Sequence, residues 1–125
     1  MHMTKKLILV IDDSASLREV VGIALKGAGY DVIEAVDGQQ ALARLDGRRI
    51  HLIVCDVNMP VMDGLTFVRQ AKLLPRYRFV PIIMLTTELR EHKKLEGQMA
   101  GAKAWMVKPF RPEQMLQAVA KLVLP

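Results

Sequence analysis

The sequence has few residues that could support redox or zinc chemistry. Cys55 is the only cysteine among 125 residues, which excludes a disulfide within the chain. Its place inside an apolar run favours a small core residue over a reactive thiol. The three histidines, His2, His51 and His92, are scattered along the chain and give no zinc-like spacing with one cysteine. Any chemistry must therefore come from other side chains.

Long hydrophobic runs are also missing. No apolar run approaches the roughly 20 residues that span a bilayer, and the N-terminus has no secretory apolar segment. We therefore expect a soluble, cytoplasmic protein without membrane contact. Hydrophobic residues make up 51% and charged residues 25%, which is ordinary for a globular domain. We interpret residues 1–4 as an N-terminal extension left from expression, and residues 5–125 as one domain.

The charge balance is basic, with a formal net charge of +5 and a pI near 9.6. A DNA-binding module would need a reading helix or a concentrated basic stripe, and the basic residues are instead spread over the expected helices. We therefore expect no nucleic-acid partner, and we interpret the basic residues as solvated faces or a protein-docking surface. Two small groups stand out, Arg44, Arg48 and Arg49, and Arg69, Lys72, Arg76 and Arg78.

Short apolar runs alternate five times with segments of helical periodicity. This alternation favours an α/β fold, a (βα)5 doubly wound five-stranded parallel sheet with helices on both faces. The predicted strands are 7–11, 32–36, 52–55, 80–85 and 104–107. Three of the predicted helices follow a capping box at Ser16–Glu19, a cap at Asp37 and the loop 58–64. The charged segment 88–98 is predicted to be a fourth helix, and Pro112 to be the first residue of the last one.

Four of the apolar runs end in polar side chains. The runs lead into Asp12-Asp13, Asp56, Thr86-Thr87 and Lys108-Pro109. In open parallel sheets the ligand site lies outside the carboxyl ends of the strands, so these side chains are expected to converge. Each alone is more typical of a turn, a cap or a solvated residue. The joint pattern predicts a site.

Three of the converging side chains are carboxylates. Asp12, Asp13 and Asp56 would repel one another at short range unless a proton or a cation intervenes. With the backbone carbonyl of Asn58 they form an all-oxygen set, which suits a hard ion, and a half-open site that keeps waters favours Mg²⁺ over Ca²⁺.

A metal site that also receives the Lys108 ammonium and the Thr86 hydroxyl is mixed in sign. Such a site suits phosphoryl transfer, because a phosphoryl group carries negative charge on three oxygens that a cation, an ammonium and a hydroxyl can contact. Asp56 would then be the nucleophile that forms an aspartyl phosphate.

The motifs around these residues resemble the receiver domain of two-component response regulators over residues 5–124. As a single domain, the chain most resembles CheY-type chemotaxis regulators. The resemblance implies the flavodoxin-like strand order 2-1-3-4-5, of which CheY is itself a standard example. It is carried by Val10-Ile11-Asp12-Asp13-Ser14, by Asp56-x-Asn-Met-Pro-x-Met-Asp-Gly, by Leu85-Thr86-Thr87 and by Lys108-Pro109-Phe110.

The resemblance implies a role for each acidic residue. Asp56 would be the phosphoacceptor, which takes the group from the phosphohistidine of a histidine kinase. Asp13, Asp56 and the Asn58 carbonyl would bind Mg²⁺, and Asp12 would assist through water. The protein would be a signalling protein that catalyses its own phosphorylation and dephosphorylation, not an enzyme in the usual sense.

The resemblance also implies roles for the remaining positions. Thr86 and Lys108 would contact the phosphoryl group, and the Lys108-Pro109 peptide bond would be cis. Thr86 and Trp105 would form the conformational switch, with Trp105 in place of the family's usual Tyr or Phe. Asn58 and Glu88 match positions that influence dephosphorylation.

The implied partners are a chemotaxis-type histidine kinase and a downstream protein such as the flagellar motor switch, with the chain acting as a monomer. Two alternatives stay within the family: a phosphate sink, or a member of another phosphorelay. A Mg²⁺-dependent phosphohydrolase with an aspartyl phosphate is a further alternative, but it needs a second Asp at position 58, and Asn58 cannot act as acid or base. A flavodoxin is disfavoured because Asp12-Asp13 would repel the cofactor phosphate.

Overall fold

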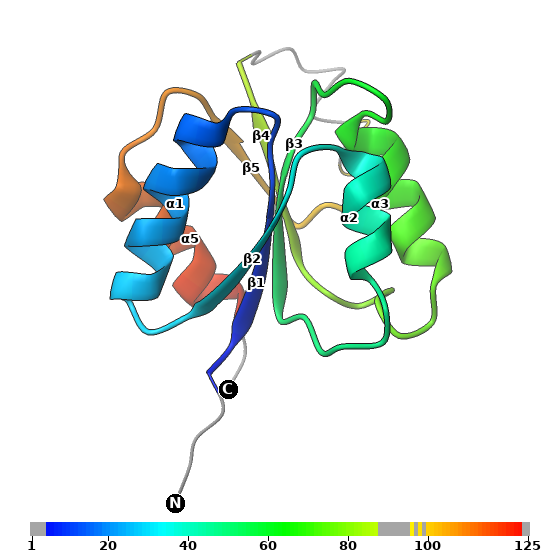
Figure 1. Ribbon diagram of the computed structural model, residues 1–125, viewed down its shortest axis with the longest axis horizontal. Coiled ribbons are helices and arrows are strands. Elements are labelled where there is room, and N and C mark those ends of the chain that lie inside the picture. The colour runs from blue at the N-terminus through cyan, green and yellow to red at the C-terminus, as the bar shows by residue number, and fades with distance from the viewer. Residues whose placement is uncertain (1–4, 88–95, 97, 99, 124–125) are drawn as a thin grey trace, which may run out of the picture.

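The computed structural model describes residues 5–87, 96, 98 and 100–123. In these residues, five parallel strands form one sheet in the order β2-β1-β3-β4-β5 (Figure 1), which confirms the predicted α/β fold and strand order. The predicted helix over 88–98 lies largely outside the described residues. The elements are β1 (Leu7–Ile11), α1 (Ala15–Gly27), β2 (Asp31–Ala35), α2 (Gly38–Arg44), β3 (Leu52–Asp56), α3 (Gly64–Leu73), β4 (Ile82–Thr86), β5 (Ala104–Val107) and α5 (Pro112–Leu122).

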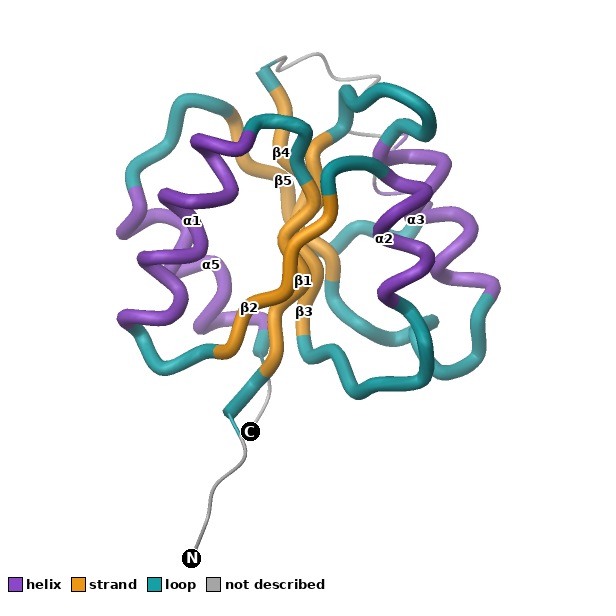
Figure 2. The backbone as a smooth tube through the Cα atoms, viewed as in Figure 1, coloured by secondary structure: helices purple, strands orange, loops and turns teal. Residues whose placement is uncertain are grey.

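Helices cover both faces of the sheet. Helices α1 and α5 lie on one face, and α2 and α3 on the other (Figures 1 and 2). Successive residues of a strand point to opposite faces, so Ile8 and Val10 pack under α1 and α5, whereas Leu9 and Ile11 pack under α2 and α3. This explains why the strands are continuous apolar runs without alternation.

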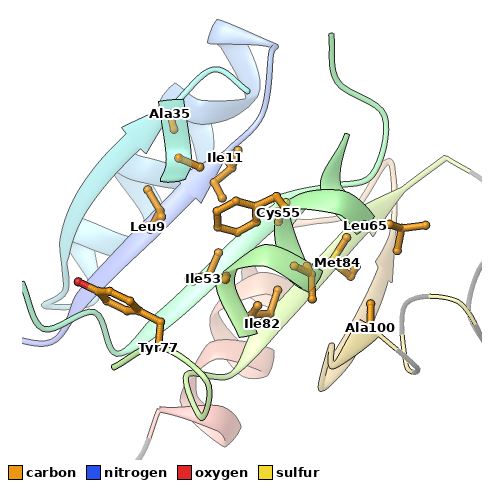
Figure 3. Packing of buried hydrophobic residues seen from close by; sticks show 14 of the residues in the cluster. Leu9, Ile11, Ala35, Ile53, Cys55, Leu65, Tyr77, Ile82, Met84 and Ala100 are labelled. Carbon is orange, nitrogen blue, oxygen red and sulfur yellow. The ribbon is translucent and has the colours of Figure 1, made fainter. Parts of the chain in front are cut away.

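The core on the α2 and α3 side is organised around a fully buried aromatic ring. Phe67 of α3 belongs to the cluster of buried residues that includes Ile53 and Cys55 of the central strand β3. Figure 3 shows how Ile53 and Cys55 lie in this cluster. Cys55 is fully buried, which confirms the prediction of a core residue, and burial raises the pKa of its thiol well above the ordinary value. A protonated thiol is a poor nucleophile, so this cysteine is inert in the folded protein.

The predicted start of the first helix was wrong by two residues, and the cap was misassigned. The helix begins at Ala15, and the side chain of Ser14, not Ser16, accepts a hydrogen bond from the Leu17 amide at 3.2 Å. The Ser14 amide itself donates to Asp12 Oδ1 at 2.9 Å. This local turn brings Ser14 to the capping position before Ser16 is reached.

Several strand boundaries also differ from the prediction, and β3 and β4 each extend one residue further than predicted, to Asp56 and Thr86. Strand β2 occupies Asp31–Ala35, one residue earlier than 32–36. Strand β4 begins at Ile82, not at residue 80, because Pro81 has no amide hydrogen for the ladder. Its carbonyl still accepts from the Ile53 amide at 3.0 Å.

Within the described ranges, no helix combines the length and apolarity needed to cross a bilayer.

Candidate functional site

The register of the sheet brings the carboxylates together. Strand β1 pairs with β3 so that Ile11 lies beside Cys55, and each strand then continues into an aspartate, Asp12 and Asp56. With Asp13 they form a group in which one carboxylate oxygen from each residue lies within 4.8 Å of the others. Asp12 and Asp56 are buried and Asp13 is exposed, so the group opens to solvent on one side.

Asp12 is the most firmly held member of this group. It is fully buried. Its Oδ1 accepts from the Ser14 amide, and its Oδ2 accepts from Lys108 Nζ at 2.8 Å. Its backbone carbonyl accepts from the Arg18 guanidinium at 2.5 Å, a contact that the sequence did not suggest. Asp12 therefore has little freedom to move toward a ligand. Asp13, by contrast, is exposed to solvent.

Lys108 joins the two buried carboxylates. Its Nζ lies 2.8 Å from Asp12 Oδ2 and 3.3 Å from Asp56 Oδ1. Burial disfavours the charged ammonium, but the hydrogen bond and charge of Asp12, together with Asp56, outweigh burial and raise the pKa of Lys108. The Lys108 amide donates to the Thr86 carbonyl at 2.7 Å, and the bond to Pro109 is cis. Lys108 is thus a fixed positive charge.

The negative charge of the carboxylates around Asp56 exceeds the positive charge that Lys108 supplies. Burial is the main cause that raises its pKa, the charge of Asp12 adds to it, and Lys108 opposes both. The result is a pKa of about 6 against an ordinary value of 3.8. Without a further cation, a large fraction of Asp56 is therefore protonated at mildly acidic pH.

The acidic group fits a magnesium ion. Bonds of about 2.1 Å place opposite ligands of an octahedral Mg²⁺ about 4.2 Å apart. The three carboxylate oxygens lie within 4.8 Å of one another, which is close enough for them to serve as ligands of one such ion, and the exposed side of the group is open to water. The raised pKa of Asp56 reflects the same unbalanced charge, which a divalent cation would relieve.

The other predicted residues differ in how deeply they are buried and in the element that carries them. Thr86 is buried at the end of β4. Asn58 is exposed in the loop after β3. Trp105 is half-buried on β5, packs against the α2 and α3 core, and lines a small cavity of about 180 Å³. Glu88 lies outside the described residues.

Comparison with known proteins decides the family. Residues 8–120 match the response regulator receiver domain. The chain belongs to this family. Receiver domains interact with histidine kinases and downstream targets, and they bind Mg²⁺ at an acidic pocket such as the one formed here by Asp12, Asp13 and Asp56. They are signalling proteins and generally not enzymes.

Both single-domain chemotaxis proteins and longer regulators resemble this receiver domain. The structure of Vibrio cholerae CheY4 superposes with a TM-score of 0.91 and 45% identity, covering 95% of this chain and 99% of that one. Helicobacter pylori CheY1 is 37% identical over 94% of this chain and 95% of its own length. The phosphate regulon transcriptional regulatory protein PhoB of Pseudomonas aeruginosa is 38% identical over 91% of this chain. The chain spans about half of the length of PhoB.

The sequence alone did not reveal how tightly the receiver's acidic loop packs. The Gly64 amide donates to the Val57 carbonyl at 2.9 Å, which closes the loop between β3 and α3. A Cβ atom at Gly64 would overlap the Asp56 carbonyl and lie 3.0 Å from Val57 Cα. The sequence predicted Gly64 as the last residue of a loop. The packing shows in addition that the absence of a side chain at Gly64 allows α3 to begin directly against the backbone of Asp56.

An apolar groove next to Lys108 was also missed. It has a volume of about 470 Å³ and lies between α1 and the segment that follows β5, with Leu17, Val20 and Phe110 in its lining. Val20 is one of the apolar residues of α1, yet its side chain is 54% exposed. The reason is that α1 turns its apolar stripe partly toward this groove and not wholly toward the sheet.

Proposed function

We propose that the chain is a phosphoacceptor switch whose Asp56 takes a phosphoryl group from a histidine kinase. The observation that carries this proposal is the Lys108 ammonium shared between Asp12 and Asp56 at 2.8 and 3.3 Å. An Asp56 oxygen attacks phosphorus, the bond between phosphorus and the kinase histidine breaks, and its electron pair returns to the imidazole nitrogen. Lys108 then compensates part of the charge on the phosphoryl oxygens.

The remaining residues of the site have distinct roles in this proposal. Asp13, Asp56 and the Asn58 backbone carbonyl hold Mg²⁺, and Asp12 contributes through water. Magnesium supplies compensation for the charge of the phosphoryl oxygens. Asp12 keeps Lys108 in place through their 2.8 Å contact. The apolar groove beside Lys108 is the surface that a phosphohistidine-bearing partner would meet as it approaches Asp56.

The conformational change that follows phosphorylation depends on a second set of residues. Thr86 moves its hydroxyl to the phosphoryl group, and Trp105 moves inward as space becomes available beside β4. Thr86 and Trp105 lie on adjacent strands, with Thr86 paired to Val107 and Met84 to Trp105. This adjacency supports a coupled motion. Asn58 and Glu88 set how long the phosphoryl group lasts.

The phosphoacceptor role predicts a single covalent adduct. With Mg²⁺ and acetyl phosphate, intact-mass measurement should show one phosphoryl group per chain, and Trp105 fluorescence should change with it. Asp56→Asn should abolish the adduct because the amide is not a nucleophile. Asp46→Asn is the matched control, since Asp46 is an exposed carboxylate that forms an ion pair with its neighbour Arg48 and is not a member of the acidic group. Multiple turnover of phosphomonoesters, or an adduct that persists without Asp56, would overturn the proposal.

Within the family, we propose a chemotaxis role, in the cytoplasm, as a monomeric receiver formed by residues 5–125 with residues 1–4 as an extension. The support is similarity to chemotaxis proteins: the structure of Vibrio cholerae CheY4 is 45% identical with a TM-score of 0.91, and Helicobacter pylori CheY1 is 37% identical. A flagellar motor switch peptide should bind the phosphorylated chain about 5- to 150-fold more tightly than the unphosphorylated chain. Trp105 fluorescence titration measures both affinities. Equal affinities would favour a phosphate sink or another phosphorelay.

A further inference from the structure

The two basic groups of the sequence partly meet at the end of the sheet opposite the acidic site. A cavity of about 660 Å³ lies beside the segments that lead into β3, β4 and β5 and beside the end of α5. Residues distant in the sequence contribute its cations, Arg48 and Arg49 before β3, Arg76 after α3, Lys103 before β5 and Lys121 on α5.

Most of these cations have no ion-pair partner in the part of the chain that the structure describes. No salt bridge is formed there by the side chains of Arg49, Arg76, Lys103 and Lys121. Arg48 differs, because it forms an ion pair with Asp46 at 2.7 Å. The local potential is positive enough to affect His51 in the cavity wall, whose pKa is lowered by burial and then by the charges of Arg49 and Lys6. Such a surface attracts an anion.

The cavity is held together by a hydrogen-bonded tyrosine. The Tyr77 hydroxyl accepts from the Gly47 amide and donates to the Arg48 carbonyl, each at 2.8 Å. The Arg76 guanidinium donates to the Gly47 carbonyl at 2.6 Å. These contacts join the segment before β3 to the segment after α3, so the walls are preorganised, as small-molecule sites usually are.

An aromatic ring stands unburied at the same cavity. The Phe79 side chain is 86% exposed although it lines the cavity. The Arg78 guanidinium lies 5.6 Å from the centre of its ring. A phenylalanine that the core does not use can stack against a planar group of a ligand, and an adjacent guanidinium can contact an anion.

We propose that this cavity binds a nucleotide, with the phosphates on Arg49, Lys103 and Lys121 and the base against Phe79. The volume lies within the range of about 300–1,000 Å³ typical of small-molecule sites. The shape is a cavity with preorganised walls, which favours a compact ligand over a membrane surface. The site is separate from Asp56, because it lies at the amino ends of the strands whose carboxyl ends carry the acidic group.

Binding of ATP in EDTA tests this proposal without magnesium at the acidic site. Calorimetry should show one ATP per chain, with affinity falling as salt rises. Adenosine, which lacks charge, and tripolyphosphate, which lacks a ring, should each bind at least tenfold more weakly. Phe79→Ala should weaken ATP about tenfold and leave tripolyphosphate unchanged. The double variant Arg49→Gln, Lys121→Gln should weaken both at least tenfold.

Lys26→Gln is the matched control, because Lys26 is an exposed cation at the end of α1 and does not line the cavity. It should leave ATP affinity unchanged. All variants should still take one phosphoryl group from acetyl phosphate in Mg²⁺, which shows that they fold and separates this test from that of Asp56. Equal affinity for ATP and tripolyphosphate, or the absence of ATP binding, would overturn the proposal. So would binding of the protein to phosphatidylglycerol vesicles, if that binding depended on Phe79 and ATP did not compete with it.

Discussion

Gly64→Ala should destabilise the protein by at least about 3 kcal/mol, because the new methyl group would overlap backbone that cannot move away easily. The nearest atom is the Asp56 carbonyl oxygen, and Val57 Cα lies 3.0 Å away. Asp56 is the last residue of β3 and Val57 follows it, and both are buried. Relief requires α3 to move or the Asp56 backbone to shift, so phosphorylation by acetyl phosphate should slow as well. Urea unfolding followed by circular dichroism measures the loss.

Gly22→Ala provides the matched control. Gly22 is also a helical glycine, but a Cβ atom there would meet nothing within 4 Å. Alanine has the higher helix propensity, so this change should stabilise the protein by roughly 0.5–1 kcal/mol. If the two variants unfolded at the same urea concentration, the close approach of α3 to β3 would not be a determinant of stability.

Asp56→Asn should stabilise the metal-free protein at pH 7 while it abolishes phosphorylation. The folded protein raises the pKa of Asp56 to about 6 from 3.8, so the folded state holds the proton more tightly than the unfolded state. The ionised carboxylate therefore lowers stability, fully above pH 6 and not at all below about pH 4. A shift of this size corresponds to about 2–3 kcal/mol. The stabilisation of the variant should appear at pH 7 and disappear as the pH falls to 4.

Thermal unfolding between pH 4 and pH 8 measures this dependence. Magnesium should raise the melting temperature of the wild-type protein more than that of Asp56→Asn, since binding to the folded state alone adds stability. Asp46→Asn is the control of opposite sign, because the hydrogen bond from Arg48 lowers the pKa of that exposed carboxyl. It should give no stabilisation at pH 7. A variant at position 56 whose stability followed the wild type at every pH would contradict the charge imbalance proposed for the site.

The sequence reveals more about this site than about the surface around it. Asp12, Asp56, Thr86 and Lys108 each follow an apolar strand, and a parallel sheet brings the ends of its strands to one edge, so local pattern and topology together predict their convergence. The motif spacing also predicts the family, which the match over residues 8–120 shows. Their specific roles in phosphorylation remain predictions for the experiments above.

Other features depend on contacts between segments far apart in the chain. Val20 faces a groove because α5 and its preceding segment lie against α1 from the other end of the sequence. The basic cavity needs Arg49 and Lys121, which no local pattern connects.

The sequence by itself thus determined the sheet, its two helical layers and the acidic centre, because strand ends and hydrophobic periodicity are local properties of the chain. The tertiary structure alone decided the pKa of Asp56, the steric requirement at Gly64 and the cavity at the opposite end of the sheet. Burial, charge proximity and close packing arise only when distant segments meet, and they have no counterpart in the order of the residues.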